Sequence, residues 1–363
     1  METDHREFRL PGPASSLAHI RQLCSLDVDS RTAMPAILAA LKSWLGFAVG
    51  AFFWTDDLGR PVAACASDPA AQRLAGHYAA EYAQSVAAWP SLVELALRRR
   101  TGVVDFSPYE REFLRSNVCR ELLAPADLDR QIAGSVVSPE GALGVLLLFR
   151  GGHERVFCRE YRRSLSLALP EIANALDRRA GDHTFVAEGD SGMVIASFDG
   201  DLRHACVRGR ELLHMAACPG QFHLGTLLEP ERQLLARLAV GVGNDYDGHA
   251  WQGPAVSIDN AWGRFQLRAA RLHGGTGTGD QVGIRIQRQV PAALKMVQTV
   301  DGLGLSPRQR ELAVLLGCSL QNEIIADRLG LRPSTVAGMV KDVYHRVGVN
   351  SRQALREMLL QPA

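Results

Sequence analysis

Apolar and polar positions in the C-terminal segment 305–363 repeat with the period of an α-helix, and local signals divide the segment into four parts. Ser306 and Pro307 form a start signal, because a hydroxyl side chain caps a helix and proline lacks only an N–H that the first position does not use. Gly330 and Gly348 suit helix ends that turn left-handed. The sequence therefore predicts four helices, the first opening at Ser306 and the others spanning Glu323–Leu329, Ser334–Val347 and Ser351–Leu360.

The second and third of these helices are joined by a very short turn, Leu331 and Arg332, ahead of Pro333. Two helices joined so tightly are typical of modules that place the second helix in a major groove about 12 Å wide. Between residues 332 and 356, five cations stand against one anion, Asp342, although the whole chain has a net charge of only +1. This local excess predicts contact with phosphates. The five cations are Arg332, Lys341, Arg346, Arg352 and Arg356.

Many positions of the segment stand in the fixed register of a known domain type. They are Leu305-Ser306-Pro307-Arg308, Glu311, Asn322, Ile325-Ala326, Leu329-Gly330, Thr335-Val336, Val343, Val347-Gly348-Val349 and Ser351-Arg352. With these residues the segment resembles the LuxR-type helix-turn-helix domains, which bind double-stranded DNA. The resemblance implies that the start of the third helix contacts phosphates and that its outer face reads base edges. The DNA-contacting residues that it implies are Arg332, Ser334, Thr335, Val336, Gly338, Lys341, Arg346 and Arg352.

The segment also departs from the family pattern. Ala337 stands where a lysine is usual, Met339 where a histidine is usual, Ile324 where a glutamate is usual, and Arg332 where a serine is common. Gly338 in mid-helix should cost roughly 1 kcal/mol relative to alanine. Because a missing side chain permits close approach of another molecule, our hypothesis is that Gly338 lies against a base or a sugar of the DNA.

Composition bounds the rest of the chain. With 363 residues, 47% of them hydrophobic and 22% charged, the chain is long enough for two or three globular domains. No apolar run reaches the roughly 18 residues of a membrane span, and the charged, proline-containing start is unlike a signal peptide. The seven cysteines lie far apart without a C-x-x-C pair, which argues against a disulfide framework and a zinc site. We expect a cytoplasmic protein with no membrane partner, no metal and no cofactor.

Residues 15–180 alternate helical and strand patterns. Helices are predicted at Ala18–Leu26 and Thr32–Leu45, around Tyr78 and Tyr82, and at Ser91–Arg99 and Phe157–Arg178. Strands are predicted at Ala48–Trp54, Pro61–Ala66, Gly102–Phe106, Gln131–Val137 and Leu143–Phe149. This order resembles a GAF-type sensory domain, which implies a sheet and covering helices around a small-molecule pocket. Such pockets are mostly apolar and aromatic, although plain core packing also explains any single aromatic residue. The pocket candidates are Phe52, Trp54, Tyr78, Tyr82, Trp89 and Phe106.

Residues 181–289 carry a second mixed pattern. It predicts a strand at Met193–Phe198, helices at Val207–Met215 and Glu229–Val240, and a hairpin of Gly263–Leu272 with Val282–Gln289. This order resembles a PAS-type module, which implies a sheet that binds a ligand or a protein partner. Residues 290–304 would be a helical linker that transmits the state of this module to the C-terminal segment, and residues 1–14 an N-terminal tail.

Two glycine-containing loops are similar to enzyme motifs but lack the partners that those motifs need. Gly189-Asp190-Ser191-Gly192 matches the nucleophile loop of trypsin-like proteases, yet the chain has no matching histidine and aspartate segments. The glycine-rich loop 274–279 has no following lysine and opens no helix, so it does not suit a phosphate cradle. We therefore expect no enzymatic activity.

These patterns predict an α+β chain. Two α/β/α-type sensory domains, GAF-like at 15–180 and PAS-like at 181–289, precede the linker 290–304 and an all-α, four-helix LuxR-type domain at 305–363. We expect a sequence-specific transcriptional regulator that is controlled by a small-molecule effector. One such module covers one half-site, so a homodimer on double-stranded DNA is expected, with dimer contacts from the helix Phe157–Arg178, the linker and the last helix.

Two alternatives to a regulator stay open. The C-terminal helices could be a plain packing domain whose few arginines merely lie on its surface. The chain could also be a protein-interaction scaffold with a weak or vestigial DNA-binding tail, because the usual lysine and histidine of the third helix are missing.

Overall fold

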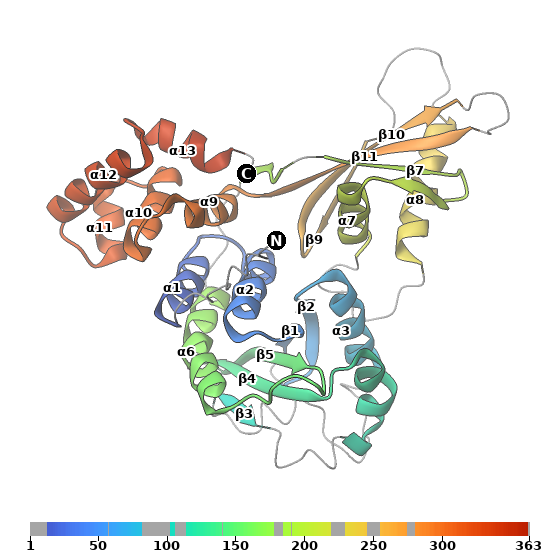
Figure 1. Cartoon of the computed structure of the whole chain (residues 1–363), viewed down its shortest axis with the longest axis horizontal. Helices are drawn as coiled ribbons and strands as arrows, with labels where there is room; N and C mark the ends of the chain where they lie inside the picture. The colour runs from blue at the N-terminus through green and yellow to red at the C-terminus, as the bar shows by residue number, and fades with distance from the viewer. Residues whose placement is uncertain are drawn as a thin grey trace, which may run out of the picture.

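The protein consists of two mixed helix and sheet units and a helical module that meet around one helix, α9 (Figure 1). The computed structural model describes residues 13–56, 58–81, 102–105, 114–139, 141–177, 184–189, 191–218, 229–244, 255–273 and 280–361. Both sheets are antiparallel, which confirms the predicted α+β class. We call residues 13–177 the first unit, 184–291 the second unit and 305–361 the C-terminal module. In these described ranges, no helix combines the length and apolarity that crossing a bilayer requires.

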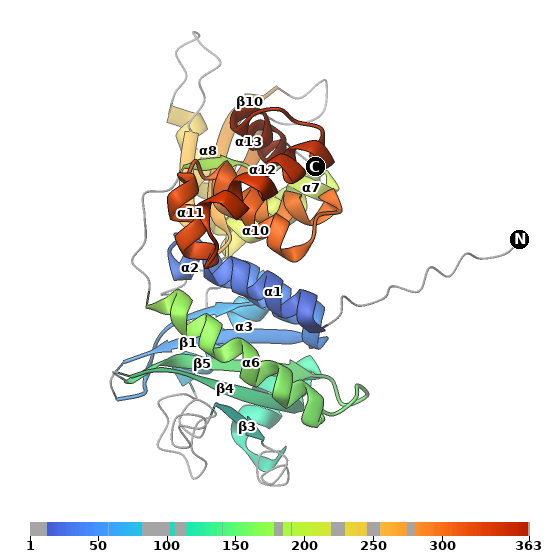
Figure 2. The same cartoon turned by 90° about the vertical axis from the view of Figure 1, so that its left-hand side faces the viewer.

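In the first unit a five-stranded sheet lies between two groups of helices (Figures 1 and 2). Helices α1 (Pro13–Cys24), α2 (Ser30–Leu45) and α6 (Arg159–Leu176) cover one face. The other face carries α3 (Pro69–Glu81) and a π-helical turn, η2 (Val118–Leu123), in a stretch for which the sequence predicted no regular structure. In sheet order the strands are β2 (Pro61–Ala66), β1 (Val49–Thr55), β5 (Gly141–Arg150), β4 (Arg130–Ser138) and β3 (Val103–Asp105).

The aromatic residues predicted to line a pocket are divided between the two faces of this sheet. Side chains alternate along β1, so the buried Phe52 and Trp54 join the core under the α1–α2–α6 face. Phe53 points to the opposite face, where its ring lies 5.4 Å from that of Tyr78 on α3. Phe52 and Trp54 therefore share no cavity with Tyr78, and these residues serve as core packing. The other candidates, Tyr82, Trp89 and Phe106, lie outside the described residues.

The second unit repeats the strand order of the first. When the five strands of each sheet path are numbered in chain order, both sheets run 2-1-5-4-3, and β6 is added to the second sheet by pairing with the end of β11. The predicted hairpin of β10 and β11 is present, whereas β6, β8 and β9 were not predicted. The strands are β6 (Phe185–Ala187), β7 (Gly192–Ala196), β8 (Leu202–Ala205), β9 (Ala255–Asn260), β10 (Gly263–Leu272) and β11 (Gln281–Pro291), and the helices are α7 (Val207–Ala216) and α8 (Pro230–Asn244).

Helix α9 (Ala292–Val300) follows β11 directly and is a core helix rather than a bare linker. It packs against α10 (Pro307–Gly317) and α13 (Arg352–Leu360) of the C-terminal module and also contacts α1. Met296 and Val297 are completely buried. A Cβ on Gly317 of α10 would lie 2.6 Å from the Met296 sulfur, so glycine is needed for this close approach. Most of α9 is covered in this way, and Gln298 is its one exposed residue, so the helix leaves little surface for the dimer contact predicted for residues 290–304.

The C-terminal module has four helices whose ends fall at the predicted signals. Ser306 caps α10 in a capping box with Gln309, and the Ser351 side chain caps α13. Gly330 and Gly348 end α11 and α12 with φ of +59° and +74°. The helices are α10 (Pro307–Gly317), α11 (Asn322–Leu329), α12 (Pro333–Val347) and α13 (Arg352–Leu360), and the 3-10 turn η4 (Asp301–Leu303) precedes them.

A buried arginine at the end of β5 fastens the end of α2. Arg150 is only 3% exposed, and its guanidinium donates hydrogen bonds to the carbonyl oxygens of Leu45, Gly46 and Arg155. Its guanidinium lies 4.3 Å from the ring centroids of both Phe157 and Tyr161. One cation thus satisfies carbonyls at the end of α2 and packs the start of α6.

We expect Arg150→Met to destabilise the protein by at least about 3 kcal/mol, because several partly or fully buried carbonyls lose a charged donor while the side-chain stem is kept. Urea unfolding followed by circular dichroism measures the change. Arg163→Met on the exposed face of α6 is the control and should shift the free energy of unfolding by less than about 0.5 kcal/mol. Equal stability of the two variants would contradict the role given to Arg150.

Candidate nucleic-acid interface

The turn between α11 and α12 fixes the direction in which α12 leaves the module. Gly330 adopts the left-handed conformation, and the amide of Leu331 donates to the Ala326 carbonyl at 2.9 Å, which closes the end of α11. Arg332 is extended, with φ −77° and ψ 144°, and Pro333 then opens α12. The short turn predicted from the sequence is therefore built from a glycine, an extended residue and a proline.

One face of α12 is anchored in the core of the module. Val336 and Val343 are completely buried and join the cluster that contains Ile325 and Leu329 of α11. The sequence assigned Val336 both to this apolar stripe and to the DNA-contacting set. Only the first assignment holds, since a side chain that packs against α10 and α11 is not available to a ligand on the outer face.

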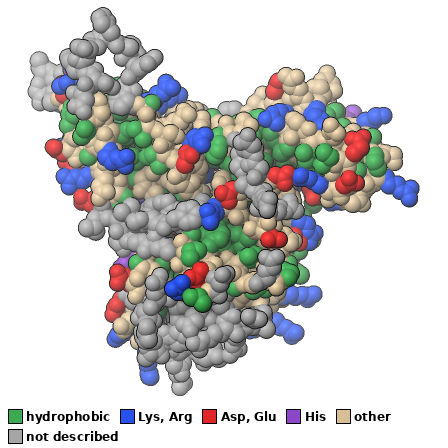
Figure 3. All heavy atoms as spheres, turned by 180° about the vertical axis from the view of Figure 1, so that it is seen from behind, with side chains coloured by type: hydrophobic (Ala, Val, Ile, Leu, Met, Phe, Trp, Pro, Cys, Tyr) green, Lys and Arg blue, Asp and Glu red, His purple; other side chains and the backbone are tan. Residues whose placement is uncertain are grey.

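The opposite face of α12 is exposed at the outer end of the molecule. α12 lies at the far left in Figure 1, and the view from that side in Figure 2 shows α11 and α12 toward the reader. Lys and Arg side chains project from this end of the module in the space-filling view, with acidic groups among them (Figure 3). The exposed residues from the predicted set are Arg332, Ser334, Thr335, Gly338, Lys341 and Arg346.

The eight lysine and arginine side chains of the C-terminal module fall into two groups. Five are engaged within the chain through carbonyl or side-chain oxygens: Arg308, Arg310, Arg328, Arg352 and Arg356. The other three, Arg332, Lys341 and Arg346, form no hydrogen bond or ion pair with any other residue that the structure describes. All three unengaged cations are on α12 or at its start.

Arg352, which the sequence predicts to contact DNA, belongs to the engaged group. Its guanidinium donates to the Leu320 carbonyl and, at 2.9 Å, to the Asn322 side chain. Arg356 likewise donates to the Gly317 carbonyl at 2.6 Å. These two arginines of α13 hold the connection between α10 and α11. The cationic excess that the sequence predicted between residues 332 and 356 is therefore smaller on the outer surface.

The first turn of α12 adds neutral donors to these cations. No side chain caps the helix start, where Ser334 and Thr335 are exposed. The partial positive charge of a helix N-terminus suits an anionic oxygen, although the amides of Thr335 and Val336 already donate to the Arg332 carbonyl and Pro333 has no N–H. The arrangement can therefore hold a phosphate at the start of α12 while side chains further along reach a groove.

Two further exposed residues on α12 lie outside the predicted DNA-contacting set. His345 lies seven positions after Gly338, which puts both on one helical face, and it adds a donor or acceptor there. Asp342 lies beside Lys341 and lowers the local positive charge. The seven-residue spacing from Gly338 could have placed His345 on the exposed face of α12 from the sequence alone.

The comparisons with known proteins show no family for the chain. No family model matches it, and no curated protein matches it. Among solved structures, the sensor region of a sensor histidine kinase is similar at 14% identity, with 70% of this chain and 91% of that chain covered and a TM-score of 0.18. At that TM-score the likeness carries no argument. Function must be inferred from the residues of the interface.

We expect Gly338→Ala to stabilise the fold by up to about 1 kcal/mol, because alanine favours helix and its Cβ would meet open space. The same substitution should weaken sequence-specific DNA binding several-fold, because the methyl group would stand between the helix and the DNA. Urea unfolding and duplex titration on the same variant measure both effects. Unchanged specific affinity would remove the contact assigned to Gly338.

Proposed function

We propose that the protein is a sequence-specific, DNA-binding transcriptional regulator in which α12 enters the major groove of double-stranded DNA. The observation that carries the proposal is the distribution of cations in the C-terminal module. Arginines elsewhere in the module are engaged within the chain, whereas those of α12 and its start are exposed and unengaged. A helix anchored on one face, with cations on the other, has the form of a recognition helix.

The LuxR-type register of the sequence supports the same assignment and gives roles to individual residues. Lys341 lies on the exposed face at a position that reads base edges in such domains. Arg332 and Arg346 stand at the two ends of α12, where they suit phosphates on either side of the groove. Ser334 and Thr335 add hydroxyl donors at the start of the helix.

The first and second units are proposed as GAF-like and PAS-like sensory domains of a cytoplasmic protein. Their support is an antiparallel sheet of identical strand order in each, with helices packed on it. A small-molecule effector would shift an equilibrium between arrangements of the module that do and do not fit DNA. A homodimer is the proposed working form, because one recognition helix reads only one half-site. The exposed face of α6, which includes Leu167 at 50% exposed, stays available for that contact.

We expect Arg346→Ala to weaken binding to all duplexes alike and to lower the slope of log affinity against log salt by about 0.9. Lys341→Ala should instead reduce the preference for a duplex selected from a randomised pool over a duplex of scrambled sequence by about 1–3 kcal/mol, because a base contact is lost. Fluorescence anisotropy with labelled duplexes at several salt concentrations measures both.

Arg268→Ala is the matched control, since this arginine is exposed on β10 in the second unit, away from the interface. It should leave affinity, preference and salt slope unchanged. Affinity that does not depend on salt in the unmodified protein would favour the scaffold alternative over the regulator.

A further inference from the structure

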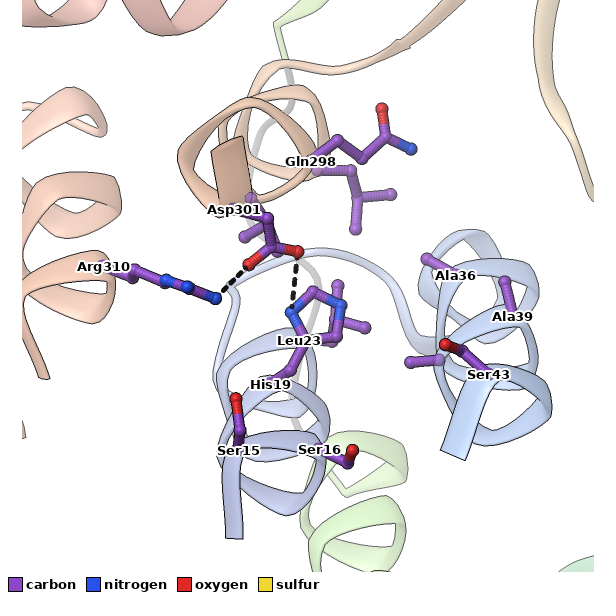
Figure 4. Close-up of a pocket in the computed structure, with 13 residues that line it drawn as sticks. Ser15, Ser16, His19, Leu23, Ala36, Ala39, Ser43, Gln298, Asp301 and Arg310 are labelled. Atoms are coloured by element: carbon purple, nitrogen blue, oxygen red, sulfur yellow. Dashed lines mark hydrogen bonds and ion pairs between the residues drawn. The ribbon is translucent and has the colours of Figure 1, made fainter. Parts of the chain in front are cut away.

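We propose that a cleft between the first unit and the C-terminal module is a binding site for a small amphipathic carboxylate. The cleft has a volume of about 430 Å³, within the range of small-molecule sites. Its walls come from α1, α2, α9 and the start of the C-terminal module (Figure 4). A bound molecule would therefore touch the first unit and the module at once.

One side of the cleft is apolar. Ala36, Ala39 and Ala40 of α2 form this wall, and their small side chains leave the space open. Leu23 of α1 and Val297 of α9 face the same space. Together they offer a hydrocarbon or aromatic body a surface from which water is displaced.

The other side of the cleft is built around one carboxylate with two basic partners. Arg310 Nη1 donates to Asp301 Oδ1 at 2.9 Å, and His19 Nδ1 lies 3.4 Å from Asp301 Oδ2 (Figure 4). The Arg310 guanidinium has five N–H groups and gives one of them to Asp301, so an anionic head group can accept from others. A carboxylate is the group that places a single charge and two acceptor oxygens there.

The Nδ1 atom of His19 is buried and faces Asp301, so it positions the Asp301 carboxylate and does not itself reach a bound molecule. The hydroxyl of Ser15 and the amide of Gln298 also border the cleft and could orient the ligand head.

The expected pocket inside the first unit offers far less room. On the face that holds Tyr78, the cavity among the described residues has a volume of about 20 Å³, enough for about one water molecule. The junction cleft is therefore the better place for an effector of the size proposed. Its effect on DNA binding rests on the proposed function, but the binding itself does not.

The test is calorimetric titration of the purified full chain with octanoate and 2-naphthoate, and with 1-octanol and 2-naphthalenemethanol as uncharged counterparts. At least one carboxylate should bind with one site per chain, and at least about tenfold more tightly than its alcohol. Binding of neither carboxylate, or equal affinity for acid and alcohol, would overturn the proposal.

Variants locate the site. Ala36→Phe and Ser43→Trp each fill the cleft from α2 and should abolish binding, and Arg310→Gln should reduce carboxylate affinity at least about tenfold while sparing the alcohol. Ala80→Phe, at an exposed alanine of α3 outside the cleft, is the matched control and should bind normally. Thermal melts identify any variant that fails to fold. Binding that survives both Ala36→Phe and Ser43→Trp would overturn the proposal.

A duplex titration with and without the carboxylate separates this site from the proposed function. Carboxylate binding by a protein that ignores DNA would support the cleft and refute the regulator. DNA binding by a protein that binds no carboxylate would support the regulator and refute the cleft as a binding site.

Discussion

The structure depends on the burial of one short helix, α9, between parts of the chain that are far apart in sequence. Met296, Val297 and Val300 are completely buried, and glycine at position 317 allows α10 to approach the Met296 sulfur. Since α9 continues directly from β11 and also contacts α1, any shift of either sheet unit reaches the C-terminal module through packed side chains. The C-terminal module is thus packed against the rest of the protein through α9 and is not joined to it by an unpacked linker.

Polar contacts reinforce this joint and divide the arginines by role. Arg328 of α11 pairs with Asp27 of the first unit at 2.7 Å, and Arg310 pairs with Asp301 beside His19. These pairs are partly exposed, so each adds little stability by itself. The Arg328–Asp27 pair and the contact of Asp301 with His19 connect the first unit to the C-terminal part of the chain and so specify how the module sits on that unit. Among the described residues, the cations of α12 and its start take no part in such contacts. A module whose other arginines bond within the chain while these stay exposed has a surface suited to an outside polyanion.

The local parts of this fold were predictable, and the long-range parts were not. Helices of the C-terminal module carry their own signals, such as the Ser306 cap and the glycine ends, so their bounds follow from the sequence. β8 and β9 are short and largely exposed, and they lack the apolar run that identifies a strand. Val336 satisfied two patterns at once, and only packing decided between them. The junction cleft could not be foreseen, because alanines of α2 meet residues more than 250 positions later in the chain.

The central claim is that α12 is a recognition helix, and selection from a pool of randomised duplexes tests it most directly. The full chain would be incubated with the pool at low ionic strength, with and without octanoate, and the retained duplexes sequenced over several rounds. The account predicts enrichment of a motif with two related half-sites, and loss of that enrichment when Lys341 is replaced by alanine. Retention of no duplex, or of duplexes with no shared sequence, would contradict it.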